Sequence, residues 1–330
     1  MRVFRWLVVI LLVTPGAWLL SGTAVAAPRD PQLSGWSAER VHGRHLPDPV
    51  RATPAEIARF FAGLGPGAAA DLAARYPHLV GNLDGAPPPV RLAVNKGFLV
   101  YDRTGDGRIA QVFGDLTTAE RIAVLVPGVD NRLANFATGH GRVQRRAPAW
   151  QARQLFDEAV ALQPGARVAV VAWLGYDPPE GIGREAIREE RAEAGAAALV
   201  RFVDGLVAYR PDARISVFGH SYGSVVAGLA AASLSPRVGD LVAVASPGMG
   251  VDRAADLHTH ARVWAGAARS DWIHRVPGVR LLGLGHGTLP SDPEFGARPL
   301  PTDGVADHDG YFMPGTAALR GMAGILLGSQ

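Results

Sequence analysis

The chain has 330 residues, of which 48% are hydrophobic, and a formal net charge of +3 at pH 7, so it can bury a real core and is not a disordered protein. It contains no cysteine, which excludes disulfides, thiolate catalysis and Cys-ligated zinc. The basic residues are arginines except for Lys96, and they form no basic run with interleaved aromatic residues, so we expect no nucleic-acid partner.

Residues 1–26 have the pattern of a signal peptide. Arg2 and Arg5 precede an apolar stretch of 15 residues, from Trp6 to Leu20, and Ala24-Val25-Ala26 fits the small-x-small cleavage rule. The apolar stretch is short for a membrane-spanning helix. We therefore expect cleavage rather than retention as an anchor, no stable membrane span afterwards, and a secreted or cell-envelope location.

The next segment, residues 27–96, is predicted to be an N-terminal extension that is partly helical. Residues 27–50 are rich in proline and polar residues, which favours an extended lead-in. Helical spacing over residues 55–74, interrupted by a glycine-rich stretch, predicts two short helices. Two β-like runs at 97–101 and 108–113 then flank an Asp-Gly turn, which is typical of a hairpin.

Residues 97–330 are predicted to form one α/β domain. Apolar strands are expected at 122–126, 168–173, 215–218 and 241–245, with weaker candidates at 262–265 and 279–284. Amphipathic or apolar helices are expected at 149–162, 189–209, 222–234 and 316–327. Buried strands that alternate with helices imply a mostly parallel sheet with helices on both faces. Residues 178–188 are predicted to be an inserted loop that could act as a lid.

The run Gly219-His220-Ser221-Tyr222-Gly223 matches the pattern G-x-S-x-G. This pattern is short enough to arise by chance, and an ordinary glycine-rich turn is the alternative. However, a predicted strand precedes Ser221 and a helix of small residues follows it, as in a nucleophile elbow. We therefore predict that Ser221 is a catalytic nucleophile.

A serine nucleophile needs a base, and the base needs an acid that orients it. In the elbow-type fold, the acid and then the base follow the serine along the chain. Asp271 comes shortly after the candidate strand 262–265, where the acid belongs, whereas Asp252 and Asp292 are rivals in less suitable positions. For the base, His286 and His308 both fit the order, and position alone does not separate them.

Two backbone N–H groups should hold the oxyanion. One belongs to Tyr222, the residue after the nucleophile. The other is expected after the first strand of the alternation, where Gly128 permits a tight turn, and Val129 is the predicted donor.

These segments resemble an actinobacterial α/β-hydrolase family of unknown function. The resemblance covers about residues 80–325 and rests on Asp84-Gly85-Ala86-Pro87 with Asn95, Leu125-Val126-Pro127-Gly128-Val129, Trp173-Leu174-Gly175-Tyr176-Asp177-Pro178-Pro179, Gly219 to Gly223, His286-Gly287, Asp292-Pro293-Glu294-Phe295-Gly296, and Asp307-His308-Asp309-Gly310-Tyr311-Phe312. It implies the α/β-hydrolase fold over residues 97–330 and favours His308 over His286 as the base. The family has a Gly-His-Ser-Ser-Tyr type segment at this point. This chain keeps the histidine and the tyrosine, but its flanking residues differ.

The sequence therefore predicts a serine hydrolase that cleaves a carboxylic ester, either a small acyl ester or a lipid-like one. A catalytically silent α/β-hydrolase fold that serves as an envelope binding or interaction module is the alternative. We expect no cofactor and no metal: His258, His260 and His274 lie close in sequence but lack a carboxylate at ligand spacing. The oligomeric state is left open.

Overall fold

The protein is built around one eight-stranded sheet, described here from a computed structural model of residues 31–278, 280 and 284–330. Its strands are β3 (Val100–Asp102), β4 (Arg108–Gly114), β5 (Arg121–Val126), β6 (Val168–Leu174), β7 (Arg214–His220), β8 (Val238–Val244), β9 (Arg262–Gly266) and β10 (Arg298–Pro299). They lie in the order β10-β9-β8-β7-β5-β6-β4-β3. The strands from β5 to β10 pair in parallel, whereas β3 and β4 form the predicted antiparallel hairpin. The predicted α/β fold is confirmed.

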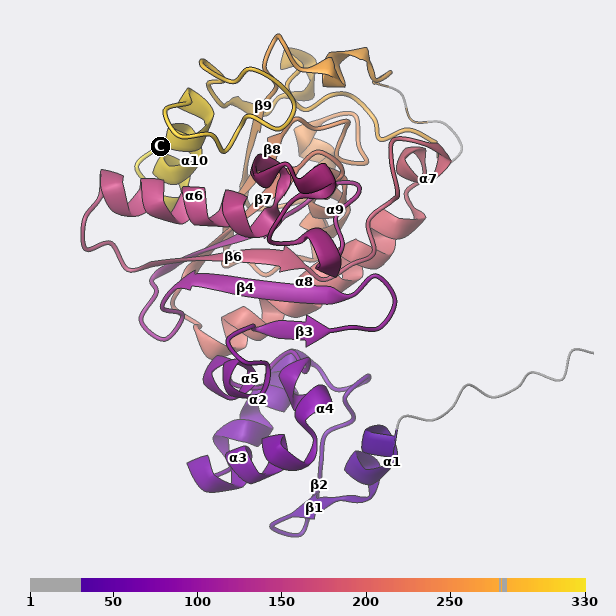
Figure 1. Ribbon diagram of the computed structural model, residues 1–330, viewed down its shortest axis with the longest axis vertical. Coiled ribbons are helices and arrows are strands. Elements are labelled where there is room, and N and C mark those ends of the chain that lie inside the picture. Colours follow the sequence, from indigo (N-terminus) through magenta and orange to yellow (C-terminus); the bar gives the residue numbers. More distant parts are fainter. Residues whose placement is uncertain (1–30, 279, 281–283) are drawn as a thin grey trace, which may run out of the picture.

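Helices cover both faces of the sheet (Figure 1). They are α6 (Pro148–Leu162), α8 (Glu190–Tyr209), α9 (Tyr222–Ala230) and α10 (Ala317–Leu327), while the short helix α7 (Arg184–Ile187) lies in the loop between β6 and α8. Side chains alternate along β5: Val124 joins the core under α8 and α9, while Ala123 and Leu125 join the core under α6 and α10. This two-sided burial explains why the strands read as continuous apolar runs in the sequence.

Single turns of 3-10 helix occur in the connecting loops. They are η1 (Leu133–Asn135), η2 (His140–Arg142), η3 (Gln144–Arg146), η4 (Ala231–Ser233), η5 (Ala254–Leu257), η6 (Trp272–Arg275) and η7 (Pro293–Phe295). The strand order reverses at β5, because the chain passes from β5 to β6 on one side and then to β7 on the other. Ligands of open α/β sheets bind at such a switch point, beyond the carboxyl ends of the strands. The carboxyl ends of β5 and β7 are therefore where a site is expected.

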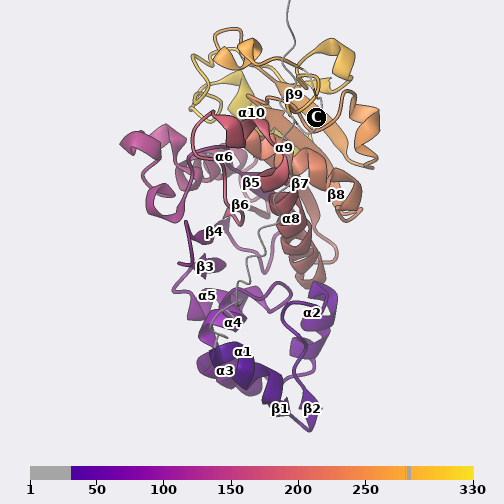
Figure 2. The ribbon, with the colours of Figure 1, turned by 90° about the vertical axis from the view of Figure 1, so that its right-hand side faces the viewer.

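The N-terminal extension lies at one end of the molecule, next to the β3–β4 hairpin (Figures 1 and 2). It contains α1 (Pro31–Ala38), β1 (Arg40–Val41), β2 (Arg44–His45), α2 (Pro54–Ala62), α3 (Pro66–Arg75), α4 (Pro77–Gly81) and α5 (Pro88–Val94). It has an apolar cluster of its own, and Arg201 of α8 ties it to the sheet domain by donating to the carbonyls of Pro49 and Ala52.

One prediction for this extension is wrong. Residues 27–50 were expected to be an extended lead-in, but residues 31–45 form a helix and a small hairpin. The reason is Trp36, which is buried, packs edge-on against Tyr76 and donates its indole N–H to the carbonyl of Pro47. Long-range burial of this one aromatic residue outweighs the local proline content.

Two other predictions fall outside what the structure describes. The predicted signal peptide, residues 1–26, lies outside the described residues, as do residues 279 and 281–283 of the candidate strand 279–284. Within the described part of the chain, no helix is both long and apolar enough to cross a bilayer.

Candidate active site

Ser221 lies in the turn between β7 and α9, at the carboxyl edge of the sheet. Its φ and ψ angles are 54° and −128°, a backbone conformation that a residue with a side chain rarely adopts. The turn is tight: a Cβ added at Gly223 would lie 2.1 Å from the carbonyl oxygen of Val126. Glycine is therefore required there, and the strain holds the Ser221 side chain out of the helix.

The structure brings His308 and Asp271 to Ser221. His308 Nε2 lies 3.0 Å from Ser221 Oγ, and His308 Nδ1 lies 2.8 Å from Asp271 Oδ1. Ser221 and His308 are 87 residues apart in the chain, and His308 and Asp271 are 37 residues apart, yet the three side chains form one continuous line of hydrogen bonds. His308 lies in an irregular segment between β10 and α10, and Asp271 follows β9, as its position in the sequence predicted.

The Asp271 carboxylate is held in place by further donors. Its Oδ1 accepts the N–H of Ile273, and its Oδ2 accepts the hydroxyl of Tyr311 at 2.7 Å. Burial alone would raise the pKa of Asp271, but the hydrogen bond and charge of His308, together with these two donors, bring the pKa below its ordinary value. The carboxylate is therefore ionised and fixed opposite the imidazole.

Tyr311 is a residue whose role the sequence analysis did not identify. It is fully buried, and its hydroxyl both donates to Asp271 and accepts the N–H of Ala268 at 2.8 Å. The signal was present in the sequence, because Tyr311 stands three positions after His308 in the segment that carries the family resemblance.

His220, inside the G-x-S-x-G run, also contacts the base. Its Nε2 lies 2.9 Å from the carbonyl oxygen of His308, so this nitrogen carries the proton and donates. Burial, helped by repulsion from His308, lowers the pKa of His220 to about 4. His220 is therefore neutral at pH 7. The Trp272 ring also packs against the His308 ring, with 4.4 Å between their centroids.

The alternative base, His286, is not brought to Ser221. Its Nε2 lies 2.6 Å from the carbonyl oxygen of Ala186, and its ring packs edge-on against Tyr222. Among the described residues it makes no hydrogen bond to Ser221. The rival acids are also engaged elsewhere: Asp252 accepts from Thr288, and Asp292 caps η7.

The predicted oxyanion turn lies against the nucleophile. A Cβ added at Gly128 would lie 2.7 Å from Ser221 Cβ and 3.1 Å from the backbone nitrogen of Tyr222. Asn131 Nδ2 donates to the carbonyls of Gly128 and Val129 at 3.0 Å each. Because the C=O and N–H of a trans peptide point in opposite directions, this contact turns the Val129 N–H away from Asn131.

Both predicted donors are available to a ligand. Neither the Val129 N–H nor the Tyr222 N–H finds an acceptor within the part of the chain that the structure describes. Tyr222 is the first residue of α9, where backbone N–H groups have no partner in the helix and the helix dipole favours negative charge.

The predicted lid segment, residues 178–188, lies beside this turn. The Tyr222 hydroxyl donates to the carbonyl of Arg188 at 2.8 Å, and the N–H of Gly181 donates to Asp130 Oδ1 at 2.7 Å. The segment contains the short helix α7, and these two bonds attach it to Tyr222 of α9 and to Asp130 of the predicted oxyanion turn.

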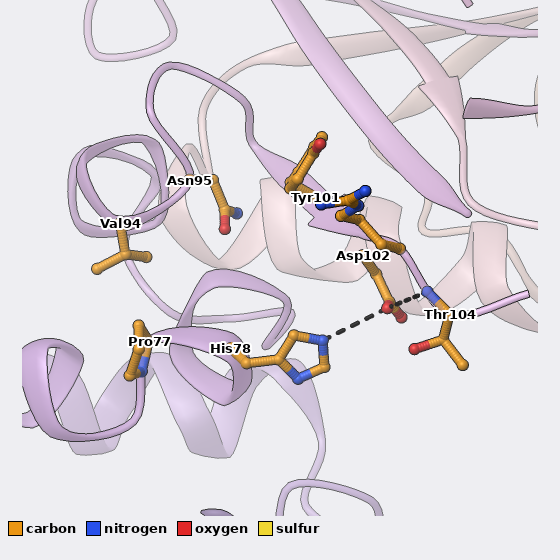
Figure 3. Close-up of a pocket in the computed structure, with 8 residues that line it drawn as sticks. Pro77, His78, Val94, Asn95, Tyr101, Asp102 and Thr104 are labelled. Atoms are coloured by element: carbon orange, nitrogen blue, oxygen red, sulfur yellow. Dashed lines mark hydrogen bonds and ion pairs between the residues drawn. The ribbon is translucent and has the colours of Figure 1, made fainter. Parts of the chain in front are cut away.

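A cavity of about 440 Å³ lies elsewhere, between the N-terminal extension and β3 (Figure 3). His78 and Asp102 face each other in it at 3.4 Å. Asp102 is also bound by Arg108 and by the N–H of Thr104, and these donors hold its pKa far below the ordinary value although burial opposes them. Its carboxylate is an anchor for the hairpin turn. Within the described residues no cluster of three or more potential metal ligands occurs.

Comparison with known proteins bears on the family of this chain. A family model described as alpha/beta hydrolase matches residues 102–281. The uncharacterized protein Rv2079 of Mycobacterium tuberculosis is 32% identical over 254 residues, which is 68% of this chain and 37% of that protein. Rv0963c of the same organism is 35% identical over 174 residues, 50% of this chain and 64% of that protein. The chain thus spans less than two thirds of either relative.

Two solved structures are similar at low identity. The crystal structure of esterase PE8 has 14% identity to this chain and a TM-score of 0.43, and the matched region covers 66% of this chain and 97% of the esterase chain. XC6422 from Xanthomonas campestris, described as a serine hydrolase without a lid, has 16% identity and a TM-score of 0.39, and covers 69% and 91%.

Proposed function

This chain belongs to the α/β-hydrolase family, and on that premise we propose that it is a serine hydrolase that cleaves a carboxylic ester through an acyl-enzyme. The observation that supports this most is the unbroken line of hydrogen bonds from Ser221 through His308 to Asp271. A serine hydroxyl is a weak nucleophile unless a base takes its proton and an acid orients that base. This arrangement supplies both.

The reaction follows from the positions of these groups. Ser221 Oγ attacks the ester carbonyl while His308 Nε2 takes the hydroxyl proton. Asp271 holds His308 Nδ1–H and stabilises the imidazolium, and the N–H groups of Val129 and Tyr222 stabilise the oxyanion. His308 then gives its proton to the leaving alkoxide, which departs as the alcohol. Water attacks the acyl-enzyme with His308 as base and releases the acid.

For the substrate we propose a small acyl ester or a lipid-like ester. Exposed apolar side chains beside the nucleophile turn support an acyl chain: Ile182 and Ile187 of the predicted lid segment are 68% and 46% exposed, and Leu284 is 50% exposed. The N–H of Gly285 donates to the carbonyl of Ile187, and Arg188 pairs with Leu284 in a β-bridge, so Ile187 and Leu284 lie on neighbouring segments. If residues 1–26 direct export, as proposed from the sequence, the enzyme acts outside the cytoplasm or in the cell envelope.

A fluorophosphonate probe tests the nucleophile. Wild-type protein should be labelled, and Ser221→Ala should not be. Ser37→Ala is the matched control, because the Ser37 hydroxyl donates to the carbonyl of Leu33 within α1, in the N-terminal extension. No labelling of the folded wild type would favour the alternative, a catalytically silent binding module. Labelling that survives Ser221→Ala would show that another residue is the nucleophile.

A pair of variants tests the base. In hydrolysis of a p-nitrophenyl ester, His308→Ala should lower kcat about 10³-fold or more, because no other base lies within reach of Ser221 Oγ among the described residues. His286→Ala should retain kcat within about tenfold. A larger loss for His286→Ala than for His308→Ala would reverse the assignment.

A further inference from the structure

Two carboxylates flank the proposed base, and each has its own arginine. Asp307 Oδ2 lies 2.9 Å from Arg145 Nη2, and Asp309 Oδ2 lies 2.6 Å from Arg146 Nε. The two arginines are adjacent in η3, more than 160 residues away in the chain. Two consecutive cations therefore bind the residues immediately before and after His308.

The arginines stand on a well-fixed support. Arg145 and Arg146 directly precede α6, and the buried Gln151 on the first turns of that helix donates its side-chain amide to the carbonyl of Arg145 at 2.9 Å. The same connection, between β5 and α6, begins with the proposed oxyanion turn at Val129. One loop thus carries a proposed oxyanion donor at its start and the partners of the base segment at its end.

His308 itself lies in an irregular segment. Residues 300–316, between β10 and α10, form no helix or strand. The His308 ring contacts the rings of Trp272 and His220, and its carbonyl accepts the bond from His220, but no regular secondary structure fixes its backbone. A shift of about 1 Å in a reacting group can cost about 100-fold in rate. The base therefore needs additional contacts to stay in line with Ser221.

We propose that Arg145 and Arg146 are positioning residues that hold His308 in its reactive position through Asp307 and Asp309. This inference rests on the proposed function. The two pairs are unequal: Asp307 is 47% exposed and Asp309 only 15%, while both arginines are about 40% exposed. Solvent screens the pair of Arg145 and Asp307 more strongly, so the pair of Arg146 and Asp309 contributes more to the position of His308.

Ester hydrolysis by the full chain tests the proposal. Expected losses in kcat are about twofold for Arg145→Ala, about fivefold for Arg146→Ala and about tenfold for the double variant, with KM unchanged. Arg153→Ala is the control, because Arg153 of α6 forms an exposed ion pair with Asp157, one turn away on the same helix. This variant should keep the wild-type kcat.

Reversal of the charges separates positioning from packing. Arg146→Asp alone should lose more activity than Arg146→Ala, and adding Asp309→Arg should recover most of it. Salt at 1 M should lower kcat of the wild type toward that of the double alanine variant and leave that variant unchanged. A double alanine variant with kcat within twofold of the wild type overturns the proposal. So does a loss of kcat in Arg146→Asp that the added Asp309→Arg does not restore.

One readout is independent of turnover. The His308 Nδ1 proton, hydrogen-bonded to Asp271, should give a low-field proton NMR signal that disappears in Asp271→Asn. This signal should broaden in the double alanine variant and persist in Arg153→Ala. An unchanged signal in the double variant also overturns the proposal. If the wild type shows the signal but no hydrolysis, the proposed function fails while the contact at His308 stands.

Discussion

Replacing Tyr311 with phenylalanine removes one hydroxyl from the centre of the site. That hydroxyl donates to Asp271 Oδ2 at 2.7 Å and accepts the N–H of Ala268 at 2.8 Å, in a fully buried position. After the change, Asp271 Oδ2 has no donor among the described residues and the Ala268 N–H has no acceptor. A hydrogen bond to a charged group contributes about 1.5–3 kcal/mol, and a buried unpaired N–H costs about 1–3 kcal/mol.

We therefore expect Tyr311→Phe to lower the free energy of unfolding by about 3 kcal/mol, measured by urea titration. Asp271 keeps its bonds from His308 and Ile273 through Oδ1 alone, so its carboxylate is free to rotate and the imidazolium is stabilised less well. We expect kcat/KM to fall by about 10- to 100-fold, which corresponds to about 1.4–2.7 kcal/mol of transition-state stabilisation.

The matched control is Tyr76→Phe. Tyr76 also donates its hydroxyl to a carboxylate, Glu39, at 3.0 Å, but it belongs to the N-terminal extension, away from Ser221. This control should leave kcat/KM unchanged. If Tyr311→Phe unfolds more easily but hydrolyses the ester within twofold of the wild-type rate, then Tyr311 supports the fold only and the orienting role is refuted.

Three further changes should give distinct results. Gly128→Ala should cost about 100-fold or more in kcat, because the added methyl group would lie 2.7 Å from Ser221 Cβ. Gly67→Ala, in α3 of the N-terminal extension, meets no atom within 4 Å and should keep the wild-type kcat; equal rates for the two would contradict the close approach of the oxyanion turn. The pKa of His220 is lowered from 6.5 to about 4 in the folded protein, so the unfolded chain binds the proton first as the pH falls, and the wild type should lose up to about 3 kcal/mol of stability between pH 6.5 and pH 4. Urea titrations over this range should show a smaller loss of stability for His220→Gln than for the wild type. An equal loss would be evidence against a buried neutral His220. Thr53→Ala, which breaks the capping box of α2, should lower the free energy of unfolding by about 1 kcal/mol without changing kcat. A fall in kcat would mean that the N-terminal extension acts on the candidate active site.

Local patterns in the sequence predicted the strands β5 to β9, the helices α6, α8, α9 and α10, and the turn that carries Ser221. Strands such as β5 are buried on both faces and therefore read as unbroken apolar runs, and the glycines around Ser221 match the pattern of a strand-to-helix turn, in which Gly223 lies against the carbonyl of Val126 at the end of β5. The acid Asp271 was predicted because the apolar run of β9 shows where that strand ends, and the acid is expected shortly after that end. Each of these features leaves a pattern within a few consecutive residues, even where the contact that requires it joins distant parts of the chain.

The base required the tertiary structure. His286 and His308 both follow Asp271 in loops, and no local pattern in the chain says which loop folds back over Ser221. The family resemblance favoured His308, and the structure places His308 Nε2 3.0 Å from Ser221 Oγ. Likewise, the bonds from Tyr311 to Asp271 and from Arg146 to Asp309 join residues 40 and 163 positions apart. Such contacts arise from the packing of irregular segments, which have no periodicity to read, so only the folded chain decided them.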